Sequence, residues 1–114
     1  MHEIDERPWG IFEVLLDEAY CKVKRITVWP GQRLSLQHHE NRSEVWVVVL
    51  GEGRAYLAGR KLLMSAGDSI RIPKLQKHRM SNDSSEPLVF IETQYGESFD
   101  EDDIVRHEDD YDRV

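Results

Sequence analysis

Three side chains that can bind a metal ion lie close together in the first half of the sequence, and a fourth follows in the second half. Gln37, His39 and Glu44 occupy a short polar window between two apolar runs, and His78 follows a turn rich in Pro and Lys. Imidazole nitrogens with carboxylate and amide oxygens form a mixed donor set, which suits Zn, Mn, Fe, Co or Ni. Such a set leaves coordination positions open for water or a substrate. The residue types therefore predict one divalent metal ion at these four side chains.

The spacing of these residues decides whether they can meet. Gln37 and His39 are two residues apart in an extended run, so they share one face of a sheet, and His38 points the other way. Glu44 faces the same interior if its strand pairs antiparallel with that run, whereas His78 must arrive from a separate strand. Taken alone, each residue also has an ordinary interpretation, as a surface histidine or a solvated carboxylate. The hypothesis therefore depends on all four converging.

Short strand-like runs recur along the chain, separated by turns rich in Gly, Pro and Asn. Residues 20–29 alternate between two faces with a period of two, and residues 45–50 form a β-branched run typical of a central strand. The expected strands are residues 11–16, 20–29, 33–39, 45–50, 54–58, 61–64, 69–72, 78–81 and 88–95. A hairpin turn is expected at Gly59 and Arg60. Because no segment has a long helical period, the sequence predicts one all-β domain over residues 1–114, a sandwich or a barrel.

The charge of the chain is unevenly distributed. The formal net charge is −7, yet residues 1–96 contain equal numbers of basic and acidic side chains, so residues 97–114 carry the whole excess. A neutral body with an acidic tail argues against nucleic-acid binding, which needs clustered cations. We expect the tail either to pack back near the mouth of the barrel, with Ile104 and Val105 as its apolar contacts, or to remain a solvated acidic end.

The sequence also bears on cellular location. No apolar run reaches the roughly 18 residues that suggest a membrane-spanning helix, and the charged residues 1–10 lack the apolar region of a signal peptide. The single Cys21 cannot form an intramolecular disulfide and is expected to be a small buried apolar residue. These features predict a cytoplasmic protein.

The spacing around the four candidate ligands resembles the two motifs of the cupin family. The first motif is matched at Gly31, Gln37, His39, Glu44 and Gly51, with Gln37 in place of its first histidine. The second motif is matched at Gly67, Pro73, His78 and Asn82, with Leu75 where a second glycine usually stands. The resemblance implies a cupin double-stranded β-helix, which is a small jelly-roll barrel, with a metal ion on its inner face.

A closer resemblance covers nearly the whole chain. The stretches RPWGIFEVL, HHENRSEVWVVVLGEG, IPKLQKH, EPLVFIETQYG and EDDIVRHEDDYDR are similar to the cupin domain of type II phosphomannose isomerases. In bifunctional members that domain follows a mannose-1-phosphate guanylyltransferase domain. Gln is usual in the family at the position of Gln37, and the four ligands carry over as the metal set. The family usually has further histidines where Asn41 and Val45 stand in this chain.

This resemblance implies a metal-dependent isomerase that interconverts mannose 6-phosphate and fructose 6-phosphate. Such a reaction moves a proton through an enediol, so it needs a general base, an electrophile at the carbonyl oxygen and an anchor for the phosphate. The expected catalytic residues are Arg42, Glu92 and Lys77. The expected substrate-binding residues are Arg42, Lys74, Arg106 and Arg113. Arg42 is the first choice for the phosphate because it lies in the ligand loop and a planar guanidinium can bond two oxygens at once.

Other interpretations of these residues remain open. Lys74 and Lys77 are equally well explained as solvated loop charges, and Glu92 either lines the pocket or lies at its rim. The departures at Asn41 and Val45 favour a second function, a cupin that binds a sugar phosphate or regulates without catalysis. A metal-dependent oxygenase-type cupin is less well supported, because such sites usually have histidine at the first ligand position. By analogy with the fold, exposed sheet edges predict a homodimer that covers them.

Overall fold

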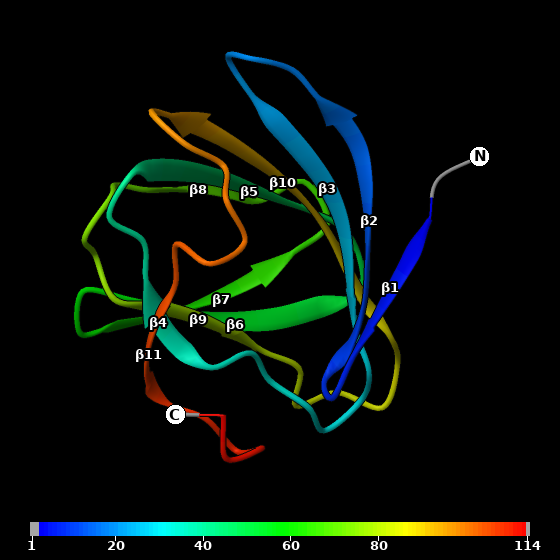
Figure 1. The fold of residues 1–114 in the computed structure, drawn as a ribbon. Coiled ribbons are helices and arrows are strands. Elements are labelled where there is room, and N and C mark those ends of the chain that lie inside the picture. Colours follow the sequence, from blue (N-terminus) through cyan, green and yellow to red (C-terminus); the bar gives the residue numbers. More distant parts are fainter. Residues whose placement is uncertain (1–2, 114) are drawn as a thin grey trace.

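The computed structural model describes residues 3–113, and Figure 1 shows them as two antiparallel sheets that face each other. The strands are β1 (Ile4–Arg7), β2 (Gly10–Asp17), β3 (Lys22–Val28), β4 (Leu36–His38), β5 (Arg42–Leu50), β6 (Glu52–Leu57), β7 (Arg60–Ser65), β8 (Ser69–Ile72), β9 (His78–Ser81), β10 (Leu88–Gly96) and β11 (Val105–Glu108). The described residues form no helix, which confirms the all-β prediction. Accordingly, residues 3–113 contain no helix with the length and hydropathy that crossing a membrane requires.

The larger sheet has the strand order β1-β2-β3-β10-β5-β8, with its longest strands, β5 and β10, next to each other. These two strands pair antiparallel, so that Trp46 lies opposite Glu92 and Glu44 lies opposite Gln94. Successive residues of a strand point to opposite faces. The alternating burial of β5 and β10 shows that these four side chains all point inward. The pairing therefore gathers polar groups from distant parts of the sequence on the inner face of one sheet.

The smaller sheet has the order β11-β4-β9-β6-β7. Its strand β4 has three residues, shorter than the expected run 33–39, and it places Gln37 opposite His78 of β9. Before β4, the chain is held to the sheet by a bridge between Arg33 and Ser81 and by a hydrogen bond from Leu34 N to the carbonyl of Met80. The short strand β4 therefore joins the first ligand motif directly to the strand that begins with His78.

The interior of the barrel has a polar part beside an apolar core. Val48, Phe90, Leu88, Met80 and Ala55 are fully buried and belong to one apolar cluster. The buried polar set includes Lys22, Lys24, His39, Arg42, Glu44, His78, Glu92 and Gln94. Burying charged groups is costly unless they are paired or hydrogen-bonded. Because such groups gather in one region, this part of the barrel is the candidate functional site.

Two local features differ from the expectations. The hairpin between β6 and β7 turns at Ala58 and Gly59, with φ values of 51° and 82°, so the turn lies one residue earlier than expected. Positive φ at both central residues is what a two-residue hairpin loop of the type I′ class requires. The terminal segment also forms a strand, β11, which pairs with β4. Its four residues are too few and too polar for an alternating pattern to stand out in the sequence.

Candidate metal centre and ligand cavity

His39, Glu44 and His78 form a buried cluster in the polar part of the barrel. One ligand atom from each of the three lies within 4.8 Å of the other two. His39 Nε2 is 3.3 Å from Glu44 Oε2, and His78 Nε2 is 3.8 Å from Glu44 Oε1. All three residues are at most 4% exposed. The cluster offers two imidazole nitrogens and one carboxylate to a single point, a donor set that fits a divalent transition metal.

The second nitrogen of each imidazole is held by a backbone carbonyl. His39 Nδ1 lies 2.6 Å from the Asp103 carbonyl oxygen, and His78 Nδ1 lies 2.9 Å from that of Gln76. A carbonyl can only accept, so each Nδ1 carries the proton and each Nε2 keeps its lone pair toward Glu44. Backbone carbonyls commonly orient metal-binding histidines in this way.

Burial keeps both histidines neutral. Desolvation lowers the pKa of His78 to about 4. Desolvation also lowers the pKa of His39, and the nearby charge of Arg42 adds to the effect. Neutral imidazole is the form that binds a metal ion. The cluster is therefore in its ligand form at neutral pH.

Arg42 lies beside this cluster and holds its carboxylate. Its Nε donates to Glu44 Oε2 at 2.9 Å, and its Nη2 lies 3.3 Å from His39 Nε2. The side chains of Arg42 and Glu44 are 6% and 1% exposed. An ion pair this deeply buried is stable only while both partners are present. Arg42 therefore holds the Glu44 carboxylate in position, and it also lines the cavity.

A second carboxylate, Glu92, lies on the neighbouring strand and shares a hydrogen-bond donor with Glu44. Trp46 Nε1 donates to Glu44 Oε1 at 3.0 Å and to Glu92 Oε1 at 3.1 Å. Gln94 Nε2 donates to Glu92 Oε2 at 2.8 Å. Burial raises the pKa of Glu92, and the charge of Glu44 raises it further. Glu92 also lines the cavity beside this cluster, which is one of its two expected placements.

A cavity of about 300 Å³ opens above this cluster. Its cationic lining residues are Arg7, Lys24, Arg42, Arg106 and Arg113. Its apolar lining residues are Trp9, Phe12, Ile26, Leu34, Trp46 and Ile104. The acids Glu44, Glu92, Glu101 and Asp102 also line it, so the cations exceed the acids by one. Cations beside apolar side chains suit a small anionic molecule that also has an apolar face.

The terminal segment closes one side of this cavity. Figure 1 shows it, in orange and red, running from the end of β10 across the end of the barrel to β11. Glu101 accepts from Lys22 Nζ at 2.8 Å and lies 2.8 Å from Lys24 Nζ, and Asp103 accepts from the backbone N–H groups of Glu40 and Asn41 at 2.9 Å. Ile104 lines the cavity, while Val105 is 37% exposed. The acidic segment therefore lies against the mouth of the barrel, with Ile104 rather than Val105 as its apolar contact.

The structure brings together only some of the residues predicted for the site. Gln37, His39, Glu44, His78, Arg42, Glu92, Arg106 and Arg113 all line the cavity. Gln37 Nε2 donates to the Ser35 carbonyl at 3.4 Å, so its role as a metal ligand stays a prediction.

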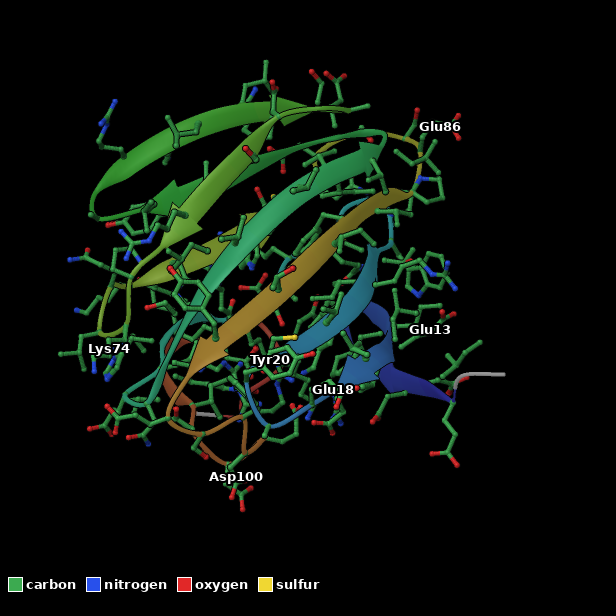
Figure 2. All side chains as sticks on the ribbon, turned by 90° about the horizontal axis from the view of Figure 1, so that it is seen from above. Glu13, Glu18, Tyr20, Lys74, Glu86 and Asp100 are labelled. Atoms are coloured by element: carbon green, nitrogen blue, oxygen red, sulfur yellow. The ribbon has the colours of Figure 1, made fainter. Side chains whose placement is uncertain are left out.

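Lys74 and Lys77 are placed differently from the prediction, because neither is among the lining residues of the cavity. Lys74 Nζ instead bonds Glu97 Oε1 at 3.3 Å, and Lys77 is exposed. Figure 2 shows Lys74 on a loop at the outer edge of the molecule. The loop before β9 directs both side chains into solvent, and only the strand itself turns inward.

Three charged residues of the cavity were not singled out from the sequence, namely Lys24, Glu101 and Asp102. Lys24 is 4% exposed, and its Nζ lies 4.2 Å above the centre of the Phe12 ring. The period of two in residues 20–29 already puts Lys24 on the same face as Ile26. A lysine on the apolar face of a strand is the signal that identifies this position, whereas no local pattern identifies Glu101 or Asp102.

Comparison with known proteins identifies the family. The family model described as "Mannose-6-phosphate isomerase C-terminal" matches residues 1–109. Among curated relatives, the Salmonella typhimurium mannose-1-phosphate guanylyltransferase ManC is 43% identical over 114 residues, which are 100% of this chain and 24% of that protein. The Pseudomonas aeruginosa alginate biosynthesis protein AlgA is 42% identical over 108 residues, covering 95% of this chain and 22% of that protein. The chain thus spans about a quarter of the length of these relatives.

Solved structures agree on the fold. An RmlC-like cupin from Shewanella frigidimarina superimposes with a TM-score of 0.77 at 24% identity, covering 89% of this chain and 87% of that chain. Bacillus subtilis oxalate decarboxylase, described with Mn(II) centres, superimposes with a TM-score of 0.79 at 25% identity, covering 91% of this chain and 29% of that chain. The cupin double-stranded β-helix inferred from the two motifs is thereby confirmed.

The relatives also correct the predicted activity. Several matched relatives are named mannose-1-phosphate guanylyltransferase, an activity that differs from the predicted isomerase. The prediction was wrong because it carried the activity over from the isomerase family along with the motifs, and a shared fold and motif do not fix a reaction. The relatives are enzymes, and this chain corresponds to one part of them. The chain belongs to the mannose-6-phosphate isomerase C-terminal family of cupin domains.

Proposed function

We propose that this chain is a metal-holding cupin module that binds a sugar phosphate of mannose metabolism in its barrel, in support of mannose-1-phosphate guanylyltransferase action. The observation that carries the proposal is the cavity of about 300 Å³, which has the His39–Glu44–His78 cluster in its wall and cations around it. The names of the relatives supply the class of sugar.

The residues present fit a divalent metal ion. His39, Glu44 and His78 would hold it, and Gln37, which lies opposite His78 on the adjacent strand, is the prospective fourth ligand. The nitrogen and oxygen donors suit Zn, Mn, Co, Ni or Fe. When bound, such an ion supplies a Lewis acid that orients hydroxyl or carbonyl oxygens. The apolar lining residues of the cavity give the carbon face of a sugar ring a surface to pack on.

The phosphate end is assigned to Arg106 and Arg42. Lys24 is neutralised by Glu101, and Arg113 bonds Asp109 through Nε at 2.6 Å. Arg106 has a buried Nε with no hydrogen-bond partner among the described residues. Burial lowers the pKa of Arg106, and the charge of Arg113 lowers it further. An anion in the cavity that both arginines line would satisfy the free donor of Arg106 and relieve the repulsion between Arg106 and Arg113.

Metal analysis combined with ligand binding tests this function. Purified protein loaded with Mn or Zn is expected to hold one divalent ion per chain. Mannose 1-phosphate or mannose 6-phosphate at about ten times its Kd should stabilise the folded chain by about 1.4 kcal/mol, which raises Tm by about 5 °C for a domain of this size. Unphosphorylated mannose at the same concentration serves as the ligand control.

A matched pair of variants ties the binding to the cavity. Arg106→Gln is expected to weaken sugar-phosphate binding about tenfold, because a charge-assisted hydrogen bond to phosphate is lost. Arg60→Gln removes the same charge from an exposed position at the start of β7 and should leave the affinity unchanged. Equal affinities in the two variants, or no stabilisation of the metal-loaded protein by either sugar phosphate, would contradict the proposal.

The homodimer stays a proposal at the level of the fold. The strands β1 and β8 are the outer strands of the larger sheet, and pairing either edge across a two-fold axis would cover it. Light scattering coupled to size exclusion distinguishes a mass near 13.4 kDa from twice that value. A monomer at all concentrations would remove this part of the proposal without affecting ligand binding.

A further inference from the structure

A second cavity, of about 410 Å³, lies on the outer side of the smaller sheet. We call it the outer groove and define it by Arg33, Arg54, Tyr56, Lys61, Arg79 and Glu108. Strand alternation explains its composition, because Arg79 follows the inward-pointing His78 and therefore lies on the opposite face. The outer groove shares no lining residue with the cavity inside the barrel. A ligand bound here would not contact the metal cluster.

Strand pairing aligns the groove residues in a row across three strands. Tyr56 of β6 pairs with Arg79 of β9 on one side and with Lys61 of β7 on the other. Side chains directly opposite each other on one face of a sheet lie close enough to act together. The row therefore presents an aromatic ring between two cations.

Arg79 is the unusual member of this row. Its side chain is 10% exposed, and its Nη2 is buried with no hydrogen-bond partner among residues 3–113. Its Nε donates to the Leu34 carbonyl at 3.1 Å, and its Nη1 lies 3.8 Å from Glu108 Oε1. A buried guanidinium with an unused donor is costly to maintain. Burial lowers the pKa of Arg79 and the neighbouring Arg33 lowers it further, while Asp110 and Glu108 act in the opposite direction.

The charge balance of the groove identifies the kind of ligand. Four cationic side chains line it against the two acids Asp83 and Glu108, although the chain as a whole has a net charge of −7. Arg33 is already paired with Asp110 through two hydrogen bonds, and Arg54 Nε lies 3.6 Å from Asp83 Oδ2. Arg79 and Lys61 therefore retain capacity for an anion.

We propose that the outer groove is a second ligand site, in which Arg79 and Lys61 bind the phosphate group of a small phosphorylated molecule. The planar guanidinium of Arg79 offers a directed donor, and the flexible ammonium of Lys61 adds charge. Tyr56 provides a flat apolar surface beside the phosphate for a sugar ring or a base. Glu108 is 65% exposed on its side chain, so it can move aside as the anion enters.

Amide chemical-shift titration of the whole chain tests this site, with inorganic phosphate as the first probe at constant ionic strength. The amides of Tyr56, Lys61 and Arg79 are expected to shift together with one Kd. Mannose 1-phosphate and guanosine monophosphate as further probes distinguish a sugar phosphate from a nucleotide as the better ligand. No shift in these strands up to about 20 mM of any probe, well above the range where weak sites bind, overturns the proposal.

Two variants, one that removes a positive charge from the groove and one that removes a negative charge, make the assignment specific. Lys61→Gln should raise the Kd about threefold, since an exposed charge contributes only modestly to binding an anion. Arg60→Gln, the adjacent residue outside the groove lining, should leave it unchanged. Glu108→Gln should lower the Kd about twofold, because it removes the carboxylate that competes with the anion for Arg79. Glu18→Gln, on the β2–β3 turn on another side of the molecule (Figure 2), is its control.

A third comparison separates this site from the one inside the barrel. Arg7→Gln changes a residue that lines only the barrel cavity, so it should leave the Kd measured on the outer strands unchanged. If Lys61→Gln and Arg60→Gln behave alike, or if Glu108→Gln has no effect, the outer groove is not a phosphate site. These results would leave the function proposed for the barrel cavity untouched.

Discussion

At the scale of single residues, Glu44 connects the parts of the candidate centre. It accepts from Arg42 and from Trp46, and it faces the Nε2 atoms of His39 and His78. The charge of Glu44 is therefore shared between a permanent cation and the position where a metal ion would lie. Changes at this residue affect folding and metal binding at once.

We expect Glu44→Gln to lower the free energy of unfolding by about 3 kcal/mol, because Arg42 would remain buried without its counter-charge. Urea denaturation measures the change. Glu97→Gln breaks an ion pair with Lys74 whose side chains are 73% and 50% exposed, and it should cost at most about 1 kcal/mol. Similar decreases in the free energy of unfolding in the two variants would mean that the buried pair stabilises the fold no more than the exposed pair does.

The imidazole of His78 allows metal binding to be separated from folding. His78→Asn keeps a polar side chain of smaller size, and we expect metal content to fall from one ion per chain to a small fraction of that. The far-UV circular dichroism spectrum should stay unchanged, because the pairing of β9 with β6 is made by the backbone and not by the imidazole. Elemental analysis after dialysis gives the metal content. Full metal retention in the variant would show that the ion binds elsewhere.

At the scale of elements, the terminal segment depends on charge pairs with β3. Burial tends to raise the pKa of Glu101, but Lys24 and Lys22 hold it at about 2, below its usual value of about 4.5. Because the pKa is lower in the folded state, this contact stabilises the fold above about pH 4.5, and the contribution is lost as pH falls toward 2. The side chain of Glu101 is 45% exposed, so solvent screening reduces the effect.

Glu101→Gln should therefore weaken the segment over the mouth of the barrel at neutral pH. Amide hydrogen exchange at residues 101–105 is expected to become faster, while exchange within β5 and β10 stays slow. The difference in stability between wild type and variant should disappear between pH 4.5 and pH 2. A difference that persists at pH 2 would mean that the ionised carboxylate is not the cause.

The turn between β5 and β6 places a constraint of a different kind. Gly51 has φ of 77°, and a Cβ added there would lie 2.4 Å from the carbonyl oxygen of Pro87. Gly51→Ala is expected to lower the free energy of unfolding by more than about 2 kcal/mol, because positive φ and a backbone clash add together. Gly31→Ala, with φ of 78° and nothing within 4 Å of the added Cβ, carries only the first cost. Thermal denaturation of both variants checks the difference.

At the scale of the whole molecule, the barrel has an apolar core beside a polar cavity. We expect chelation of the bound metal to lower Tm without unfolding the chain at 25 °C, since the ion stabilises only the state that binds it. Scanning calorimetry with and without EDTA measures the shift. A Tm that does not depend on chelator would argue against a metal at the His39–Glu44–His78 cluster.

Local spacing predicted much of the fold and part of the site. The period of two along the strands put Gln37 and His39 on one face. The motifs identified Glu44 and His78 as further ligands, and both lie with His39 in one cluster of the structure. These features are encoded within a few neighbouring residues, because the strand period fixes which side chains share a face. The cupin barrel followed from the same motifs.

Contacts between distant segments were decided only by the tertiary structure. The ion pairs from Glu101 to Lys22 and Lys24, and the hydrogen bond between His39 and the Asp103 carbonyl, join residues far apart in the chain. Packing of the loops and sheets likewise decides that Lys74 faces solvent. It also decides that Arg79 is buried although it lies on the outer face of its sheet. The sequence alone determined which residues share a strand face. Closure of the barrel determined which faces and loop ends come into contact, because these contacts depend on packing between the sheets and not on local backbone periodicity.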